Sequence, residues 1–336
     1  MRLALFLLAI ILVAGCAQQK ASTTTTLFQS GNAPQGNTLT GPFKGVSFSP
    51  KSFGAEDFVQ FFATAKETGN MVTWAGDWNQ LGDATSAPYS IAQLSRSNGI
   101  EPLAIASYYS QGEGRMLRQL TDEARKNYIE YAARFAEKYK PKYLAFGIEV
   151  NIMREKSPED FEAFVSLFPD VYDAVKAKSP ETTVFTIFQL ERIKGMKGGL
   201  FGGKNDPSKT EWDILEKFPK ADLVGFTTYP GLVYGSPSNL KDDYYSEIKS
   251  HVSKPVAFTE IGWHSAASPY GWESSESEQA DFVKAFFNLT GSLDTKIAIW
   301  SFAYDPDTKD PFKGIGLITK DGKKKLSWQQ WLNGRL

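Results

Sequence analysis

Two glutamates in this sequence lie where a carboxyl group could do chemistry. Glu149 closely follows the apolar run 143–146, and Glu260 closely follows the run 256–258. Unbroken apolar runs of this kind are typical of strands that are buried on both faces, as in a parallel sheet. A carboxylate at the end of such a strand loses hydration, so a partner must compensate its charge or its proton affinity rises. Two such carboxyl groups in one site are what the hydrolysis of a glycosidic bond needs.

This chemistry requires the two strands to end on the same side of one domain, and the order of the elements agrees with that requirement. Apolar runs alternate along the chain with segments of helical periodicity. Strands are predicted at 43–48, 71–75, 100–107, 143–149, 183–189, 223–228, 256–260 and 297–302. Helices are predicted at 55–68, 90–97, 122–138, 158–177, 211–218, 240–250, 275–289 and 327–332. This alternation predicts an α/β fold, a single (β/α)8 TIM barrel, with an open doubly wound sheet as the alternative.

The ends of the predicted strands are rich in aromatic and polar side chains. All strands of a (β/α)8 barrel end on one face, where sites form. Aromatic rings stack on the apolar C–H faces of sugars and polar groups bind the hydroxyls, although roughly half of the aromatic residues are expected to pack in the core. The candidate substrate-binding residues are Trp74, Trp78, Tyr109, Asn151, Gln189, Tyr229, Trp263, His264 and Trp300.

The beginning of the chain has the pattern of a secretory signal. Arg2 precedes about ten apolar residues, the length of a signal-peptide core rather than of a membrane span. The segment ends on the residues Val-Ala-Gly-Cys at 13–16, which resemble the lipobox of prokaryotic lipoproteins. The resemblance implies a signal peptide at residues 1–15 and a lipidated Cys16 that anchors the domain to the membrane, outside the cytoplasm. An ordinary signal peptide with a chance cysteine is the alternative.

The segment that follows is predicted to be a flexible tether. Residues 16–41 are rich in Thr, Gln, Gly and Asn and poor in large apolar side chains. Such a composition cannot bury enough surface to offset the entropy of the chain. The barrel is therefore expected over residues 42–336, as a monomer.

The composition bears on several classes of partner. The formal net charge is −1 and the basic residues form no basic face, which argues against nucleic acid. Two histidines and one cysteine are too few for a zinc cluster of these ligands. We therefore expect no metal and no cofactor, and a carbohydrate as the substrate.

With these motifs in place, the chain resembles the large clan of retaining glycoside hydrolases that are built on (β/α)8 barrels. The sequence Gly-Ile-Glu-Val-Asn at 147–151 is similar to the motif of the clan's acid/base strand, and Phe-Thr-Glu-Ile-Gly-Trp at 258–263 is similar to its nucleophile strand. The nearest pattern is that of the endo-β-1,4-galactanases of family 53, whose sixth strand resembles Leu-Val-Gly-Phe-Thr-Thr-Tyr-Pro at 223–230. The resemblance implies that Glu149 is the acid/base and Glu260 the nucleophile.

Two positions depart from the clan's pattern. Ile148 stands where the clan has an asparagine that binds the sugar 2-hydroxyl, and an arginine common at the end of the second strand is missing from 71–78. Asn151 is a candidate replacement donor.

Three functions stay open at this point. The first is a surface-anchored retaining glycosidase, which the paired glutamates favour. The second is a catalytically inactive glycan-binding lipoprotein on the same barrel, which the departures favour. The third is a structural protein of the cell envelope, in which both glutamates would form ordinary salt bridges.

Overall fold

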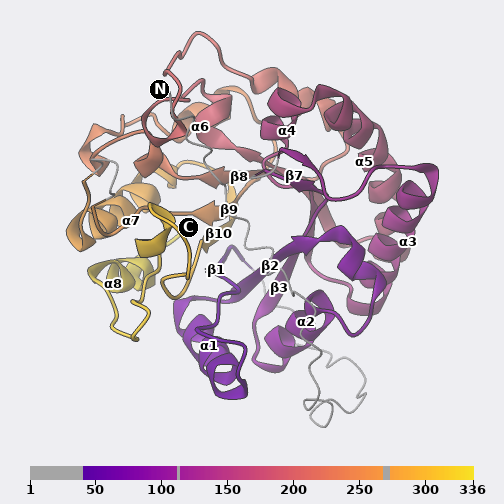
Figure 1. Cartoon of the computed structure of the whole chain (residues 1–336), viewed down its shortest axis with the longest axis horizontal. Coiled ribbons are helices and arrows are strands. Elements are labelled where there is room, and N and C mark those ends of the chain that lie inside the picture. The colour runs from indigo at the N-terminus through magenta and orange to yellow at the C-terminus, as the bar shows by residue number, and fades with distance from the viewer. Residues whose placement is uncertain (1–40, 112–113, 268–272) are drawn as a thin grey trace.

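The protein was analysed as a computed structural model, which describes residues 41–111, 114–267 and 273–336. The signal peptide, Cys16 and all but the last residue of the tether lie outside the described residues. Eight parallel strands form a closed barrel in the order β1-β10-β9-β8-β7-β6-β3-β2, and helices surround it (Figure 1). This closure confirms the predicted barrel and excludes the open sheet.

The barrel strands lie close to their predicted positions. They are β1 Phe43–Ser47, β2 Met71–Asp77, β3 Glu101–Ser107, β6 Tyr143–Phe146, β7 Thr183–Gln189, β8 Val224–Thr228, β9 Val256–Ile261 and β10 Thr295–Trp300. A short antiparallel pair, β4 Tyr109–Ser110 and β5 Arg115–Met116, follows β3 and was not predicted. The α-helices are α1 Ala55–Thr68, α2 Ala87–Ser97, α3 Asp122–Tyr139, α4 Val150–Lys156, α5 Pro158–Lys178, α6 Leu190–Ile193, α7 Glu276–Thr290 and α8 Leu326–Asn333.

Two of the predicted helices were wrong in type. The segment predicted at 211–218 contains the 3₁₀ helix Trp212–Lys217, and the segment at 240–250 contains turns and the 3₁₀ helix Ser246–Ser250. Both segments are short, and a short α-helix gains too little to offset the cost of its nucleation unless packing requires it.

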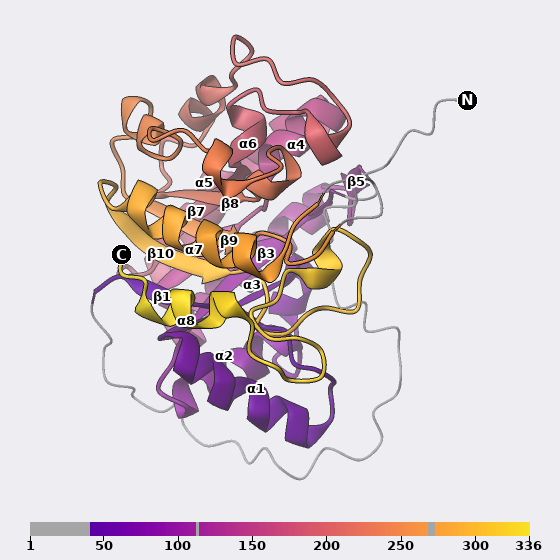
Figure 2. The same cartoon turned by 90° about the vertical axis from the view of Figure 1, so that its left-hand side faces the viewer.

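The core has two layers, divided by the alternation of side chains along each strand. Side chains that point into the barrel form an inner cluster that includes Phe43, Leu103, Phe185 and Ile299. Their neighbours along the strands point outward and pack beneath the helices in a larger cluster. Figure 2 shows α7 lying across β9 and β10 with α8 beside it. The filled interior leaves the loops at the strand ends as the place for a site.

The first strand and the last helix are fastened together. The ammonium of Lys44 on β1 donates hydrogen bonds to the carbonyl oxygens of Trp331 (2.7 Å), Leu332 (3.2 Å) and Gly334 (2.8 Å) at the end of α8. A cation at this position also interacts favourably with the helix dipole. This contact holds the two ends of the barrel domain side by side.

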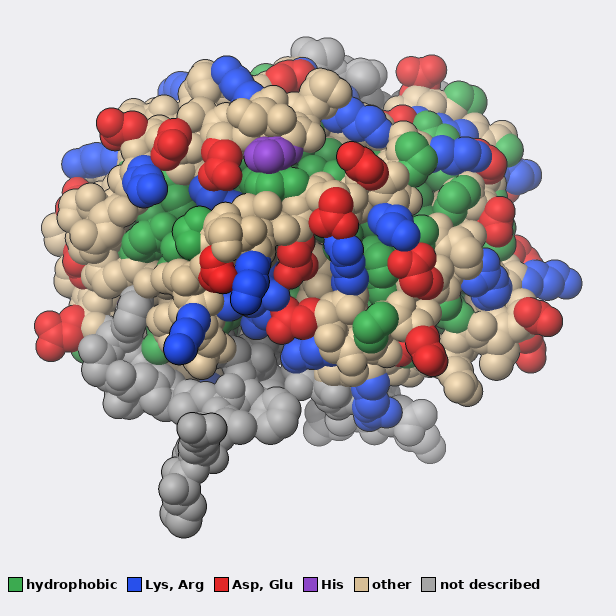
Figure 3. Space-filling view, turned by 90° about the horizontal axis from the view of Figure 1, so that it is seen from above, with side chains coloured by type: hydrophobic (Ala, Val, Ile, Leu, Met, Phe, Trp, Pro, Cys, Tyr) green, Lys and Arg blue, Asp and Glu red, His purple; other side chains and the backbone are tan. Residues whose placement is uncertain are grey.

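The surface carries charges of both signs. On the face shown in Figure 3, acidic and basic side chains intermingle with apolar ones, and no large patch of one sign covers it. Among the described residues, none of the helices has the length and hydropathy needed to cross a bilayer.

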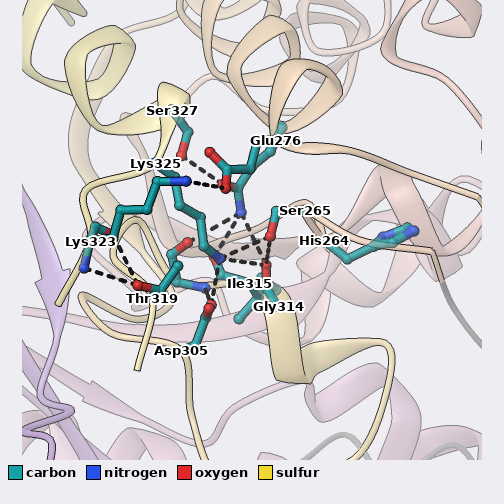
Figure 4. Close-up of polar contacts among 12 residues, drawn as sticks. His264, Ser265, Glu276, Asp305, Gly314, Ile315, Thr319, Lys323, Lys325 and Ser327 are labelled. Atoms are coloured by element: carbon teal, nitrogen blue, oxygen red, sulfur yellow. Dashed lines mark hydrogen bonds and ion pairs between the residues drawn. The ribbon is translucent and has the colours of Figure 1, made fainter. Parts of the chain in front are cut away.

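A buried polar network fastens the long loop between β10 and α8 (Figure 4). The ammonium of Lys325, which is 5% exposed, donates to Asp305 Oδ1 (2.6 Å), Ser265 Oγ (2.9 Å) and the carbonyl oxygen of Gly314 (3.1 Å). Burial lowers the pKa of Lys325, and the Asp305 carboxylate opposes this shift. The network fixes the position of a loop that reaches the mouth of the barrel.

We predict that Lys325→Met destabilises the protein by about 3 kcal/mol, because the Asp305 carboxylate would stay in a partly desolvated place without its cation. Lys320→Met is the matched control, since Lys320 pairs with Asp307 on the same loop and both side chains are exposed (63% and 93%). Its cost is expected to stay within about 0.5 kcal/mol. Equal unfolding midpoints of the two variants in denaturant would contradict this account of the loop.

Candidate active site

A pocket that is open to solvent lies where the strands end and contains both candidate glutamates. Glu149 follows β6 and Glu260 lies on β9, three strands away around the barrel. The pocket is lined by Gln111, Ile148, Glu149, Ile152, Lys156, Gln189, Arg192, Phe201, Tyr229, Leu232, Glu260, Phe302 and Phe312. Strand ends therefore supply the carboxyl groups, while loops and short helices supply most of the remaining wall.

A strained turn presents Glu149 to the pocket. Gly147 has φ +76° and Glu149 has φ +52°, so the chain enters the left-handed region twice within three residues. A Cβ on Gly147 would meet Val150 Cγ1 at 2.7 Å and Tyr108 Cε1 at 2.9 Å, so glycine is required there. For a glutamate this conformation costs about 1–2 kcal/mol. Strain of this kind persists only where the surrounding structure imposes it, and it clusters at functional sites.

The surroundings of Glu149 favour a carboxyl group that holds a proton. Its side chain is 4% exposed, and burial raises its pKa to about 7. The Thr227 hydroxyl opposes this rise by donating a hydrogen bond to Glu149 Oε1 (2.7 Å), and the charges of Arg192 and Lys156 also lower the pKa. The group can therefore exchange a proton near neutral pH, as an acid/base catalyst must.

The pKa of Glu260 is also raised, and the charge of Glu149 contributes to this rise. Burial is the main cause, the charge of Glu149 is the second, and together they bring the pKa of Glu260 to about 8. The Tyr229 hydroxyl donates a hydrogen bond to Glu260 Oε2 and thereby favours the ionised form. Because each carboxylate disfavours the ionisation of the other, the pair titrates as a unit and shares one proton around neutral pH.

A chain of hydroxyl groups behind Glu260 can serve both of its protonation states. The Tyr229 hydroxyl lies 2.8 Å from Ser301 Oγ, which lies 3.0 Å from the carbonyl oxygen of Ile261. When Glu260 is ionised, Tyr229 donates to it and Ser301 donates to Tyr229. When Glu260 is protonated, it can donate to Tyr229, which then donates to Ser301, whose own proton turns to Ile261. Each hydroxyl has one proton, so the chain reverses as a whole.

A third buried carboxyl group, Glu191, has a different environment. It is fully buried and accepts four hydrogen bonds, from Thr228 Oγ1 (2.7 Å), Tyr244 Oη (2.9 Å), the Tyr229 backbone N–H (3.1 Å) and Gln189 Nε2. Burial raises its pKa and the hydrogen bonds oppose this rise. Four donors match the acceptor sites of an ionised carboxylate. Glu191 thus ties the end of β7 to the end of β8, which carries Tyr229.

Four of the predicted site residues line the pocket: Glu149, Gln189, Tyr229 and Glu260. Trp263 and His264 line a smaller hollow beside it, and Tyr229, Leu232 and Phe312 belong to the walls of both.

The structure places the other predicted substrate-binding residues away from the pocket lining. Trp74 belongs to the outer core, and Trp78 packs on Tyr128 with ring centres 4.9 Å apart. Trp300, expected to contact the sugar, is fully buried against Trp331 and donates its indole N–H to the carbonyl oxygen of Ile315 (2.8 Å). The alternation of side chains turns Trp74 and Trp300 toward the helices.

Tyr109 and Asn151 are also buried outside the lining. The Asn151 amide exchanges hydrogen bonds with the backbone of Gln189, donating to its carbonyl oxygen (3.0 Å) and accepting from its N–H (2.9 Å). These bonds occupy the donor proposed as a replacement at position 148.

Sequence analysis missed most of the pocket's walls. Phe201, Phe302 and Phe312 form an aromatic part of the wall, and Gln111, Lys156 and Arg192 form a polar part. Phe302 was predicted as the last residue of a strand, but nothing in the local pattern distinguished the loop residues. Among the described residues, there is no group of three His, Cys, Asp or Glu side chains that could hold a metal ion.

Comparison with known proteins gives matches to solved structures alone. No protein-family model matches the chain, and neither does any curated protein. A family 39 glycoside hydrolase from Bacteroides cellulosilyticus WH2 matches with TM-score 0.58 and 19% identity over 86% of this chain. GH5_18 from Streptomyces cattleya matches with TM-score 0.63 and 13% identity over 87%. A β-glucuronidase from Bacteroides uniformis matches with TM-score 0.61 and 12% identity over 87%.

These neighbours are glycoside hydrolases with the same closed barrel. The chain spans 62% of the family 39 protein, 79% of the GH5_18 protein and 34% of the glucuronidase. At such low identity the similarity establishes the shared fold.

The carboxyl pair predicts a pH-dependent effect on stability. Both pKa values are higher in the folded protein than the ordinary value of 4.5, so the folded state binds more protons and its stability falls as pH rises from about 4.5 through about 8. Glu149→Gln removes one titrating group and the repulsion it causes. We therefore expect this variant to gain stability relative to the parent, by on the order of 2 kcal/mol, between pH 5 and pH 8.

Denaturant unfolding at several pH values measures this gain. Glu137→Gln is the control, because Glu137 is an exposed residue whose side chain is 57% accessible. A stability difference between parent and Glu149→Gln that stays constant with pH would contradict the raised pKa of Glu149.

Proposed function

We propose that this protein is a retaining glycoside hydrolase that acts on a polysaccharide or oligosaccharide by double displacement. The observation that carries the proposal is the pair of buried carboxyl groups, delivered by two barrel strands to one pocket and coupled through their charges. Paired carboxyl groups of this kind are the catalytic device of most glycosidases. The barrel-fold neighbours that are glycoside hydrolases agree with this assignment.

In the first step Glu260 attacks the anomeric carbon, and Glu149 gives its proton to the leaving oxygen. Tyr229 supports this division of roles, because its hydroxyl group donates to Glu260 and so favours a carboxylate there. Without substrate the pKa of Glu260 (about 8) exceeds that of Glu149 (about 7), which favours the shared proton on Glu260, so the proposed mechanism requires the proton to be on Glu149 once the sugar is bound. The Glu149 environment, buried and near-neutral in pKa, suits a group that must donate its proton at neutral pH.

In the second step the roles reverse. Once Glu260 is esterified to the sugar it carries no charge, so it no longer opposes the ionisation of Glu149. Glu149, now ionised, takes a proton from the water that attacks the glycosyl-enzyme, and Glu260 leaves as a carboxylate. Tyr229 again donates to the departing carboxylate. The loss of the Glu260 charge in the first step thus favours the ionised form of Glu149, which acts as the base in the second step.

A non-catalytic glycan-binding protein is the second candidate, and two observations favour it. Ile148 lines the pocket, so the clan's usual donor to the 2-hydroxyl is replaced there by an apolar side chain. The amide of Asn151 is occupied by the Gln189 backbone. The resemblance to family 53 makes β-1,4-galactan one of the polymers to test for turnover and for binding.

We also propose that the protein is attached to a membrane through a lipid on Cys16, with the barrel outside the cytoplasm. The apolar segment before Cys16 and the small residues next to it support this proposal. Multiple acyl chains would hold the protein stably, since each buried methylene contributes about 0.8 kcal/mol.

Cys16→Ser tests the anchor. We expect this variant to leave the membrane fraction, either as soluble protein or as a mislocalised precursor, when cell fractions are compared by immunoblotting. Cys16 is the one cysteine of the sequence, so the substitution affects no disulfide. Retention in the membrane at the level of the parent protein would refute lipidation as the means of attachment.

Alanine substitutions of the two glutamates should impair different steps of glycoside hydrolysis. Glu260→Ala removes the covalent step, so aryl glycosides should not be cleaved whatever their leaving group. Glu149→Ala keeps the nucleophile, so an activated aryl glycoside should still form the glycosyl-enzyme, which then hydrolyses slowly for want of a base. Added azide needs no deprotonation, and it should restore turnover of Glu149→Ala by about 10²-fold or more.

The product identifies the mechanism, because azide attack on the glycosyl-enzyme gives a glycosyl azide of retained configuration. Glu137→Ala, at an exposed position on α3, is the control and should behave as the parent does. An azide product of inverted configuration would exclude the double displacement. A parent protein that binds glycan yet cleaves no glycoside would support the second candidate.

A further inference from the structure

One part of the pocket wall carries two cationic side chains. Lys156, at the end of α4, and Arg192, on α6, both line the pocket. Arg192 Nη1 pairs with Glu155 Oε2 at 2.8 Å, and Glu155 also pairs with Lys197 at 3.1 Å, which in turn pairs with Glu211 at 2.9 Å. Lys156 donates to the carbonyl oxygen of Gln111 (2.9 Å) and has no ion pair within the described parts of the chain. The two cations repel each other across the site.

The same wall has hydrogen-bonding atoms that no described residue satisfies. Arg192 Nε is a buried donor without a partner, and Gln111 Oε1 is a buried acceptor without one. Gln111 is 1% exposed, and its Nε2 donates to the carbonyl oxygen of Ile148 (2.6 Å), which fixes the orientation of the amide. Buried polar atoms without partners are rare because each costs about 1–3 kcal/mol. Both residues line the pocket, while these two atoms themselves are shielded from solvent.

The remaining lining is largely apolar. Phe201, Phe302, Phe312 and Leu232 contribute rings and methyl groups, which suit the C–H face of a pyranose. Arg192 lies over the Phe201 ring, with its guanidinium carbon 5.0 Å from the ring centre, so the aromatic and cationic parts of the wall are in contact. A sugar that packs on the phenylalanines would therefore have a polar edge next to the cations.

We propose that the pocket is built for a sugar ring that carries a negative charge, of which a uronic acid is the simplest example. The proposal rests on the glycosidase function proposed above and specifies its substrate class. The sugar carboxylate would accept hydrogen bonds from the Lys156 ammonium and from the Arg192 guanidinium. The anion would also relieve the repulsion between the two cations. A neutral sugar offers hydroxyl oxygens alone, which accept weaker hydrogen bonds from cations than a carboxylate does, so the wall discriminates by charge.

Matched pairs of aryl glycosides test the proposal, because a glucuronide and a glucoside, or a galacturonide and a galactoside, differ only at C6. We expect the purified protein to hydrolyse the uronide of at least one pair with kcat/KM about tenfold to a hundredfold above its neutral partner, the value of one charge-assisted hydrogen bond. An aryl glycoside with a sulfate ester on O6 distinguishes the source of the charge. Faster hydrolysis of this glycoside than of the uronide would show that the cationic wall recognises a sulfated sugar. A neutral glycoside cleaved as fast as its acidic counterparts would overturn the proposal.

Two variants separate substrate recognition from an effect on Glu149. Lys156→Met should lower kcat/KM for the uronide by about tenfold more than for the neutral partner, and because the Lys156 charge lowers the pKa of Glu149, it should shift the pH profile of both substrates alike. Arg192→Lys keeps the positive charge near Glu149 but removes the planar guanidinium, so it should show a selective loss on the uronide with an unchanged pH profile. Lys209→Met is the control, because Lys209 is 82% exposed and does not line the pocket. Equal losses on both substrates with a shifted pH profile would show instead that the cations serve to adjust the acid.

Direct binding keeps the two proposals distinguishable. Calorimetric titration with free glucuronate and galacturonate, against glucose and galactose, measures the charge preference without any turnover. A protein that cleaves no glycoside but binds a uronate, and loses this binding in Lys156→Met, would overturn the catalytic function and support the charged pocket. A protein that cleaves neutral glycosides and binds no uronate would support the catalytic function and overturn the charged pocket.

Discussion

The two carboxyl groups in one desolvated pocket impose the constraint on which the rest of the site depends. Glu149 and Glu260 cannot both ionise freely, because burial raises both pKa values and the charge of Glu149 raises that of Glu260 further. The fold tolerates this arrangement because β6 and β9 belong to a closed barrel that cannot separate them. The Thr227 and Tyr229 hydroxyl groups offset part of the cost by donating to the two carboxyl groups.

Glu191 shows how surroundings separate one buried carboxyl group from another. It is as deeply buried as Glu149, but it accepts four hydrogen bonds that oppose the rise of its pKa. Glu149 accepts one hydrogen bond from a described side chain, that of Thr227, and its pKa is about 7. The number of hydrogen-bond donors that face a buried carboxyl group, rather than how deeply the group is buried, thus distinguishes a structural carboxyl group from a reactive one. Glu191 also accepts a hydrogen bond from the backbone N–H of Tyr229, and so helps to position the residue that donates to Glu260.

The sequence was informative about the strands and the residues at their ends, because hydrophobic pattern and strand order are local signals. The barrel and the convergence of Glu149, Glu260, Gln189 and Tyr229 could be predicted on this basis. The left-handed turn at Glu149 was not foreseen, because nothing in a glutamate's chemistry indicates a positive φ; Gly147 alone pointed to a turn.

The walls of the pocket could not be predicted in the same way. The sequence around a tryptophan near a strand end does not show whether its side chain points into the mouth of the barrel or toward the helices. The side chains of Trp74 and Trp300 point toward the helices. Phe201 and Phe312 lie on long connections whose path depends on distant contacts, such as those of Lys325 with Asp305 and Gly314. Charge on the wall was likewise hidden, since Lys156 and Arg192 belong to two short helices that follow different strands.

The contact between Lys44 and the end of α8 has a consequence for how the molecule would stand on a surface. Because Lys44 lies at the start of β1 and bonds to Gly334, both ends of the barrel domain lie at the face where the strands begin. The pocket opens at the opposite face, where the strands end. A chain held from its N-terminal side would therefore be attached at the face opposite the pocket, which leaves the pocket accessible to a polymer.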